Sequence, residues 1–102
     1  MAKHTSLEAQ AHLLGAMANP KRLAVLKLLV KDEVAVGPLA LQVGLSQSAL
    51  SQHLAKLREM KLVNTRRESQ TIFYSCANPV VQSVLEALEA MAITGSPKRL
   101  IA

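Results

Sequence analysis

Four short or planar polar side chains stand close together in this chain, and each of them can both donate and accept hydrogen bonds. They are Gln47, Ser48, Ser51 and Gln52. A glutamine amide can pair bidentately with the edge of an adenine in the DNA major groove, and a serine hydroxyl can donate or accept there. The four side chains therefore predict base recognition. The alternative is a solvated polar face, which any amphipathic helix can carry.

The segment that must position these side chains, residues 44–61, has the pattern of a helix. Ser46 stands where an N-cap belongs, with a hydroxyl that can accept a free backbone N–H of the first turn. Three leucines follow at the i, i+4, i+7 spacing of a buried helical face: Leu50, Leu54 and Leu57. A brief helix at residues 38–43 and a turn at Gly44-Leu45 precede this segment. Together they predict a helix-turn-helix whose second helix enters the major groove.

After residue 61 the pattern changes from helical to extended. Two β-prone runs, residues 62–67 and 71–75, flank residues 68–70, which predicts a β-hairpin with its tip at those three residues. A hairpin directly behind a recognition helix is the wing of a winged-helix domain. The chain is therefore expected to be mainly α with a small β-hairpin, a winged helix-turn-helix.

Basic side chains accompany the predicted recognition helix and wing. Arg66 and Arg67 lie close to the predicted hairpin tip, where a wing contacts the phosphate backbone or a narrow minor groove of DNA. Lys56, on the recognition helix, is expected to hold phosphate as well. The alternative for the wing is that one arginine pairs with Glu68 and merely makes the sheet edge soluble.

Capping residues predict the other long helices. A capping box at residues 5–8 starts a first helix, and Asn19-Pro20 and Asn78-Pro79 each join an N-cap to a proline at the first helical position. The last helix is expected to run to about residue 93. Lys21 and Arg22 oppose the helix dipole in the first turn of the second helix, so they are either exposed charges or phosphate contacts.

The first and last helices carry apolar faces that the core of a winged helix does not need. The residues on these faces are Leu7, Ala11 and Leu14 in the first helix and Val81, Val84, Leu85, Leu88 and Met91 in the last. Leftover apolar faces on a small protein favour self-association. We therefore expect a homodimer with these residues at its interface.

The composition fits a single small domain over residues 1–102, with a short frayed N-terminus and a disordered basic tail at residues 96–102. Twelve Lys and Arg against seven Asp and Glu give a net charge of +5, which favours a polyanionic partner. One cysteine allows no disulfide within the chain and fits a reducing cytoplasm. No signal peptide or apolar run long enough for a membrane is apparent, and no catalytic motif indicates an enzyme.

Four blocks of the sequence resemble the ArsR/SmtB family of bacterial repressors, and above all its nodulation-regulator and haemolysin-regulator-like members. The blocks are residues 18–23, 44–54, 57–58 and 62–67. The resemblance covers most of the chain, and the block Leu-Ser-Gln-Ser-Ala-Leu-Ser-Gln-His-Leu is quite specific. It implies a homodimer, joined through the first and last helices, that binds an imperfect inverted repeat in double-stranded DNA.

The sequence departs from the metal-sensing members of that family. Their cysteine box reads here as Ala-Val-Gly-Pro-Leu at residues 35–39, and the expected last helix contains no His or Asp. A related subgroup senses reactive sulfur through two cysteines, one of them on the second helix. In this chain Lys27 stands at that cysteine position, and Cys76 alone cannot form a disulfide within the chain. His53, between buried leucines, is expected to be a semi-buried packing residue. We therefore expect no metal and no cofactor.

These observations favour a cytoplasmic, nucleoid-associated repressor of transcription. Two alternatives stay open: a redox- or small-ligand-responsive repressor of the same family, and a winged helix used for protein–protein contact. The second is disfavoured because aromatic side chains, which interface cores prefer, are nearly absent.

Overall fold

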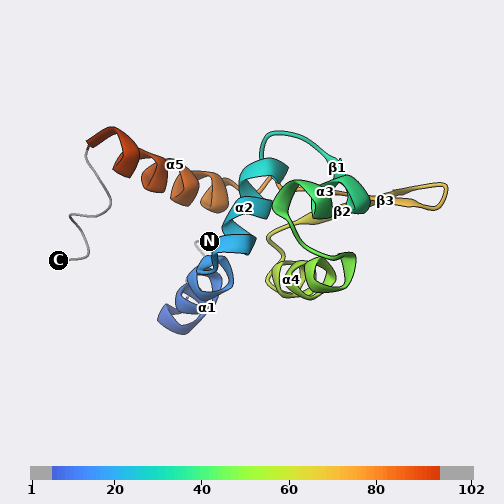
Figure 1. Cartoon of the computed structure of the whole chain (residues 1–102). Coiled ribbons are helices and arrows are strands. Elements are labelled where there is room, and N and C mark those ends of the chain that lie inside the picture. Colours follow the sequence, from blue (N-terminus) through green and yellow to red (C-terminus); the bar gives the residue numbers. More distant parts are fainter. Residues whose placement is uncertain (1–5, 95–102) are drawn as a thin grey trace.

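The computed structural model describes residues 6–94, which form five helices and a three-stranded sheet. Their arrangement is drawn in Figure 1. In order these are α1 (Leu7–Met17), α2 (Pro20–Leu29), β1 (Val34–Ala35), α3 (Val36–Val43), α4 (Gln47–Glu59), β2 (Asn64–Glu68), β3 (Thr71–Ser75) and α5 (Pro79–Thr94). The predicted mainly α fold with a hairpin is confirmed. The predictions for the N-terminus and for residues 96–102 lie outside the described residues. None of the helices in residues 6–94 has both the length and the apolarity to cross a membrane.

Polar side chains cap the N-termini of α1, α2, α4 and α5. The capping residues are Ser6, Asn19, Ser46 and Asn78. In α1 the hydroxyl of Ser6 accepts the backbone N–H of Ala9 at 3.0 Å. Ser6 is thus itself the cap, and the capping box predicted at residues 5–8 is wrong by one position. The other three caps are the ones that the sequence predicts.

Two element boundaries differ from the prediction. Helix α3 begins at Val36 rather than at residue 38, because Pro38 lies in the first turn, where a helix does not need the missing N–H. Strand β2 begins only at Asn64, and Glu68 still pairs with Thr71, so the hairpin turn is shorter than residues 68–70. Ser69 turns the chain there with a φ of +60°.

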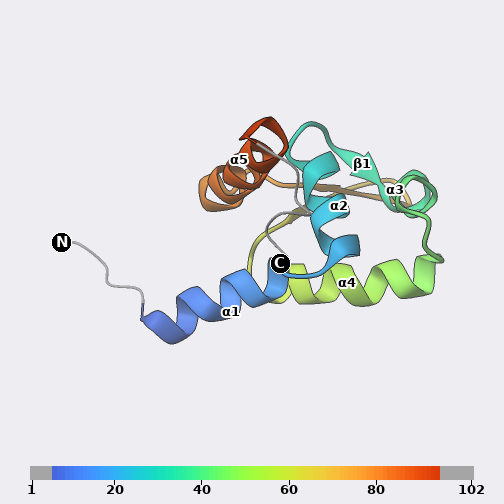
Figure 2. The same cartoon turned by 60° about the vertical axis from the view of Figure 1, so that its left-hand side comes forward.

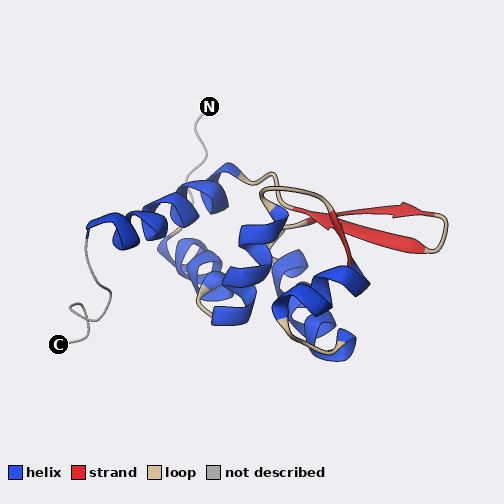
Figure 3. Ribbon diagram, turned by 45° about the horizontal axis from the view of Figure 1, so that its top comes forward, coloured by secondary structure: helices blue, strands red, loops and turns tan. Residues whose placement is uncertain are grey.

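The three strands form an antiparallel sheet in the order β1-β3-β2, with β3 in the centre. The register places Ala35, Phe73 and Arg66 in one row across the sheet. In Figure 3 the β2–β3 hairpin extends away from the helices, and α5 lies at the opposite end of the molecule. The hairpin therefore has the geometry of a wing beside the helix-turn-helix.

The core is mainly aliphatic, as the composition predicts, and its residues come from α1 to α5 and from the sheet. Its fully buried side chains include Leu26, Leu39, Leu50, Leu57, Leu62 and Val81. Figure 2 shows α2 and α3 lying over α4, which closes this core from below in that view.

One part of the interface prediction needs correction. Val81 and Leu85, of α5, are 0% and 6% exposed because they pack into the core of the same chain. They are therefore not left over for a second protomer. An apolar stripe at i, i+4 spacing is the same whether its partner lies in the same chain or in another, so the sequence could not separate the two cases.

Candidate nucleic-acid interface

Helix α4 buries one face and presents a polar face to solvent. Leu50, Leu54 and Leu57 are at most 1% exposed, so they hold the helix on the core along its length. All four predicted base-reading side chains are exposed on the other side: Gln47, Ser48, Ser51 and Gln52. A rigid helix thus presents donors and acceptors in a defined order, which is the requirement for reading base edges.

The start of α4 is held in place by its cap and by the preceding turn. The hydroxyl of Ser46 accepts the N–H of Ala49 at 3.1 Å, as predicted. Gly44 ends α3 with a φ of +71°, a conformation in which a side chain is strained. Lys21 of α2 donates from Nζ to the carbonyl oxygen of Val43 at 2.7 Å, so it ties the turn to α2. The turn residues and Lys21 together set where α4 begins.

Arg22 joins three helices. Its Nε donates to the carbonyl oxygen of Ala16, in α1, at 2.6 Å, and its Nη1 lies 3.2 Å from Nδ1 of His53, in α4. Both side chains are half-buried, which confirms His53 as a semi-buried packing residue. Lys21 and Arg22 are therefore not unpaired surface charges, because both have partners within the chain. No local pattern predicts these contacts, because Arg22 and His53 are 31 positions apart and Lys21 and Val43 are 22 positions apart.

On β2, Arg66 is held by internal partners. Its Nε and Nη2 donate to the two carboxylate oxygens of Glu33 at 2.9 and 2.8 Å, and its Nη1 lies 3.4 Å from Glu68. Its guanidinium also stacks over the ring of Phe73, 4.7 Å from the centroid. The hydrogen bonds from Arg66 lower the pKa of Glu33, and Glu33 in turn raises the pKa of Arg66.

The predicted phosphate contacts thus differ in their surroundings. The alternative pairing of one arginine with Glu68 does occur, but the main partner is Glu33, which sequence reasoning missed. Arg67 is exposed, and no side-chain partner for it is found among residues 6–94. Lys56 is likewise exposed on α4.

The C-terminal half of α4 carries one cation that the sequence analysis missed. Arg58 is exposed and lies seven positions after Ser51, which places it on the same side of the helix. Its neighbours along a shallow groove on this face are Gln52, Ala55, Lys56 and Glu59. The spacing of seven positions between Ser51 and Arg58, which is two helical turns, could have predicted that both side chains lie on the same face.

The apolar faces of α1 and α5 are only partly covered by the chain itself. Leu7 is 82%, Leu14 52% and Leu88 39% exposed, and Ala11 is exposed beside them. Val84 and Met91 are half-buried. Val80, which is 50% exposed at the start of α5, adds to this surface and was not predicted.

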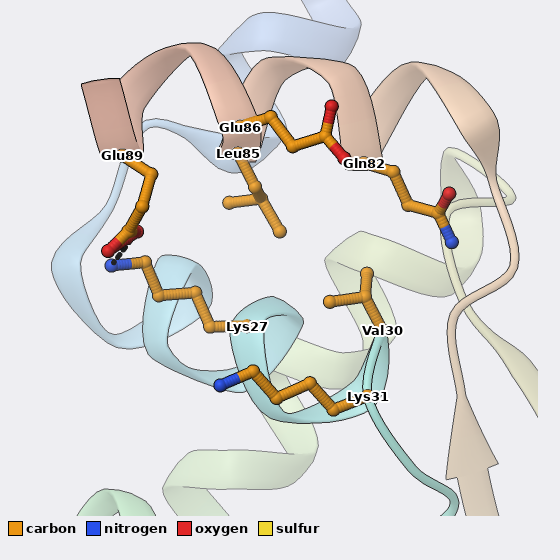
Figure 4. A pocket seen from close by; sticks show the side chains of 7 residues that line it. All are labelled: Lys27, Val30, Lys31, Gln82, Leu85, Glu86 and Glu89. Carbon is orange, nitrogen blue, oxygen red and sulfur yellow. Dashed lines mark ion pairs between the residues drawn. The ribbon is translucent and has the colours of Figure 1, made fainter.

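A groove of about 560 Å³ lies between α2 and α5 (Figure 4). Leu85 and Val30 point into it, and the two lysines and two glutamates around it include the Lys27–Glu89 ion pair at 3.5 Å. Across residues 6–94, no group of three or more His, Cys, Asp and Glu side chains could hold a metal ion. Cys76 is buried at the end of β3, and burial raises the pKa of its thiol.

The sequence is similar to a family of bacterial regulatory proteins and to individual members of known role. Residues 19–65 match the family described as "Bacterial regulatory protein, arsR family". The chain is 60% identical to the nodulation protein NolR of Rhizobium meliloti over 86 residues, which are 84% of this chain and 70% of NolR. It is 51% identical to the transcriptional activator HlyU of Vibrio cholerae over 79 residues, 78% of this chain and 73% of HlyU.

Solved structures agree with these sequence relationships. The crystal structure of NolR from Sinorhizobium fredii superposes with a TM-score of 0.80 at 52% identity, covering 93% of this chain and 99% of NolR. A Mycobacterium bovis fragment, described as a homodimeric winged helix-turn-helix DNA-binding domain, superposes with a TM-score of 0.75 at 30% identity and 90% coverage of both chains. The predicted winged helix-turn-helix fold is confirmed.

Proposed function

The chain belongs to the arsR family of bacterial regulatory proteins, and we propose that it is a homodimeric, sequence-specific DNA-binding repressor of transcription. The family and these relatives are regulators of transcription rather than enzymes. The observation that carries the proposal is the polar face of α4, exposed along a helix that three buried leucines hold on the core.

In this proposal α4 lies in the major groove with its N-terminus leading. Gln47 and Gln52 read base edges through their side-chain amides, and Ser48 and Ser51 provide adaptable hydroxyls beside them. Only a few base pairs are within reach of one helix, so one protomer cannot supply high specificity.

Basic side chains next to this helix bind the DNA backbone. Lys56 and Arg58 on α4 and Arg67 on β2 are exposed and have no side-chain partner among the described residues, so phosphate oxygens can take that place. Such contacts set the register of the protein on the duplex, but they carry no sequence information of their own.

Two protomers complete the binding unit. The partly exposed apolar residues of α1 and α5 form the interface in this proposal, without Val81 and Leu85, which the core of each protomer already uses. The remaining predicted members are Leu7, Ala11, Leu14, Val84, Leu88 and Met91. A two-fold axis would bury these faces against their own copies and place two α4 helices about one turn of DNA apart, roughly 34–36 Å. That spacing matches an imperfect inverted repeat.

We propose that DNA binding needs neither a metal nor a cofactor, because the described residues offer no ligand set. A redox-responsive form of the same regulator has little support, since the only cysteine of the chain is buried and its pKa is raised. The proposed place of action is the cytoplasm, at the bacterial chromosome.

Selection of bound duplexes from a random-sequence pool tests the function directly. We expect enrichment of an inverted repeat whose half-sites lie about one helical turn apart. Failure to enrich any sequence, together with equally weak binding to all duplexes, would contradict DNA recognition and favour a protein–protein module. In cells, a reporter behind the selected sequence should be repressed by the protein; an increase would mean activation instead.

The base-reading role is tested by Gln47→Ala with Gln82→Ala as the matched control, since Gln82 is also exposed but lies on α5. Gln47→Ala should cost about 1–3 kcal/mol on the selected duplex and relax the preference at one position in each half-site. Gln82→Ala should change neither. An equal loss for Gln47→Ala on the selected and on unselected duplexes would exclude base reading by this residue.

A further inference from the structure

Arg66 and Arg67 are neighbours on β2, but a strand sends consecutive side chains to opposite faces of its sheet. Arg66 pairs across the hairpin with Phe73, and Arg67 pairs with Ile72. The two arginines therefore meet different surroundings even though the sequence presents them as one basic pair.

The side chain of Arg66 crosses the central strand of the sheet. It passes over Phe73 of β3, with 4.7 Å between the guanidinium and the ring centroid, and ends on the carboxylate of Glu33, just before β1. Because β3 lies between β1 and β2, this ion pair connects the two outer parts of the sheet. Two parallel N–H···O bonds define the geometry of such a pair more closely than a single contact would.

The backbone at the Glu33 end of this connection also has a local hydrogen bond. The backbone N–H of Glu33 donates to Oδ1 of Asp32 at 2.8 Å, which shapes the turn between α2 and β1. The pair thus joins the wing to the turn that follows α2. Around Arg66, the negative charges of Glu33 and Glu68 offset the guanidinium, so it adds little net attraction for a polyanion.

We propose that the two arginines have separate tasks: Arg66 positions the wing through Glu33 and Phe73, while Arg67 makes the phosphate contact. This inference rests on the proposed DNA-binding function. It replaces the prediction that both arginines bind phosphate. If Arg66 turned to the DNA, it would leave the Glu33 carboxylate unpaired close to the phosphate backbone, which would oppose binding.

The salt dependence of binding separates a positioning residue from a phosphate contact. Each phosphate contact contributes about 0.9 to the slope of log K against log salt concentration. With the duplex that the protein itself selects from a random pool, Arg67→Ala should flatten the slope by about 1.8, because a dimer has two wings. Arg66→Ala should weaken binding by about fivefold per wing at most and leave the slope unchanged.

Conservative replacements sharpen the distinction. A lysine can bind phosphate as a point charge but cannot form the bidentate pair with a carboxylate. Arg67→Lys should therefore keep most of the affinity and the slope. Arg66→Lys should bind about as weakly as Arg66→Ala. Restoration of parent affinity by Arg66→Lys would overturn the proposal.

The partner residue provides an independent test. Glu33→Gln should weaken binding to the selected duplex, and the double variant with Arg66→Ala should be no weaker than Arg66→Ala alone, because both changes break the same connection. Glu68→Gln is the matched control: like Glu33→Gln it removes one negative charge beside Arg66, but it breaks only the 3.4 Å contact, so it should not weaken binding. Tighter binding by Glu33→Gln would mean that Glu33 competes with DNA for Arg66, and it would contradict the proposal.

A structural control separates a change in the wing from the loss of a phosphate contact. Amide hydrogen exchange of the free protein should quicken in β1 and β3 for Arg66→Ala and Glu33→Gln but not for Arg67→Ala, with α2 and α4 unchanged in all three. If Arg66→Ala and Arg67→Ala flatten the slope equally, the division of tasks is wrong while DNA binding stands. If the parent protein enriches no duplex, the proposed function itself fails.

Discussion

A charge placed on the exposed apolar face of α1 should separate the protomers without unfolding them. Leu14 is 52% exposed in the single chain and does not belong to its buried core. Leu14→Glu therefore leaves the buried core of the protomer intact and removes the apolar contact that a second protomer would make with the exposed half. Leu85→Glu, by contrast, would place the carboxylate inside the protomer and unfold it, because Leu85 is 6% exposed.

The size of the effect follows from the exposure of Leu14. Full burial of a leucine side chain contributes up to about 3 kcal/mol, so covering the exposed half contributes roughly 1.5 kcal/mol. Each residue occurs twice in a two-fold interface, so the two Leu14 side chains together contribute about 3 kcal/mol to the stability of the dimer. This free energy corresponds to roughly a hundredfold change in the dissociation constant. Two desolvated carboxylates without partners would add several kcal/mol more. The dissociation constant of the Leu14→Glu dimer should therefore be at least about a hundredfold higher than that of the parent dimer.

Sedimentation or light scattering over a range of protein concentrations measures this change, and circular dichroism monitors the fold. Leu41→Glu is the matched control, since Leu41 is 84% exposed but lies on α3, away from α1 and α5. Leu14→Glu should be monomeric and helical, and its binding to the selected duplex should fall to the non-specific level. A dimer of Leu14→Glu as stable as that of Leu41→Glu would refute the interface on α1.

Because Arg66 lowers the pKa of Glu33, their pair stabilises the fold above the ordinary glutamate pKa of about 4.3 and loses that effect as the pH falls through the lowered value. The difference in thermal midpoint between the parent and Glu33→Gln should therefore be present at neutral pH and vanish in strong acid. Iodoacetamide should alkylate Cys76 slowly in the folded protein and rapidly in guanidinium, because burial protects the thiol and raises its pKa. Stoichiometric zinc, cadmium or nickel should leave DNA affinity unchanged, because residues 6–94 contain no group of side chains that could hold a metal ion. A tenfold release of the duplex by any of these metals would contradict the proposal that DNA binding is independent of metal.

Features that depend on neighbouring residues could be predicted from the sequence. Ser46 caps α4 through an N–H three positions away, and Leu50 to Leu57 show their buried face through spacing alone. The hairpin follows from two β-prone runs around a turn. These signals predicted the helix-turn-helix, the wing and the exposed face of α4.

Features that depend on distant partners could not be predicted. Arg66 meets Glu33 across 33 positions, and Arg22 meets His53 across 31. Nothing in the local pattern distinguishes an arginine that will find a carboxylate from one that stays free. For the same reason the sequence pattern places Val81 and Leu85 at the interface, although the core of their own chain covers them.

The net charge of a DNA-binding protein therefore says little about how many phosphates it binds. Within residues 6–94, internal partners hold three of the basic side chains near the helix-turn-helix and wing: Lys21, Arg22 and Arg66. On α4 and the wing, the described residues leave three cations without a side-chain partner: Lys56, Arg58 and Arg67. A dimer would then make about six phosphate contacts and show a salt slope near −5, whereas a slope near −11 would follow if all the basic residues named here bound phosphate. Titration of the selected duplex at several salt concentrations decides between these values, and the steeper slope would show that the internal hydrogen bonds break when DNA binds.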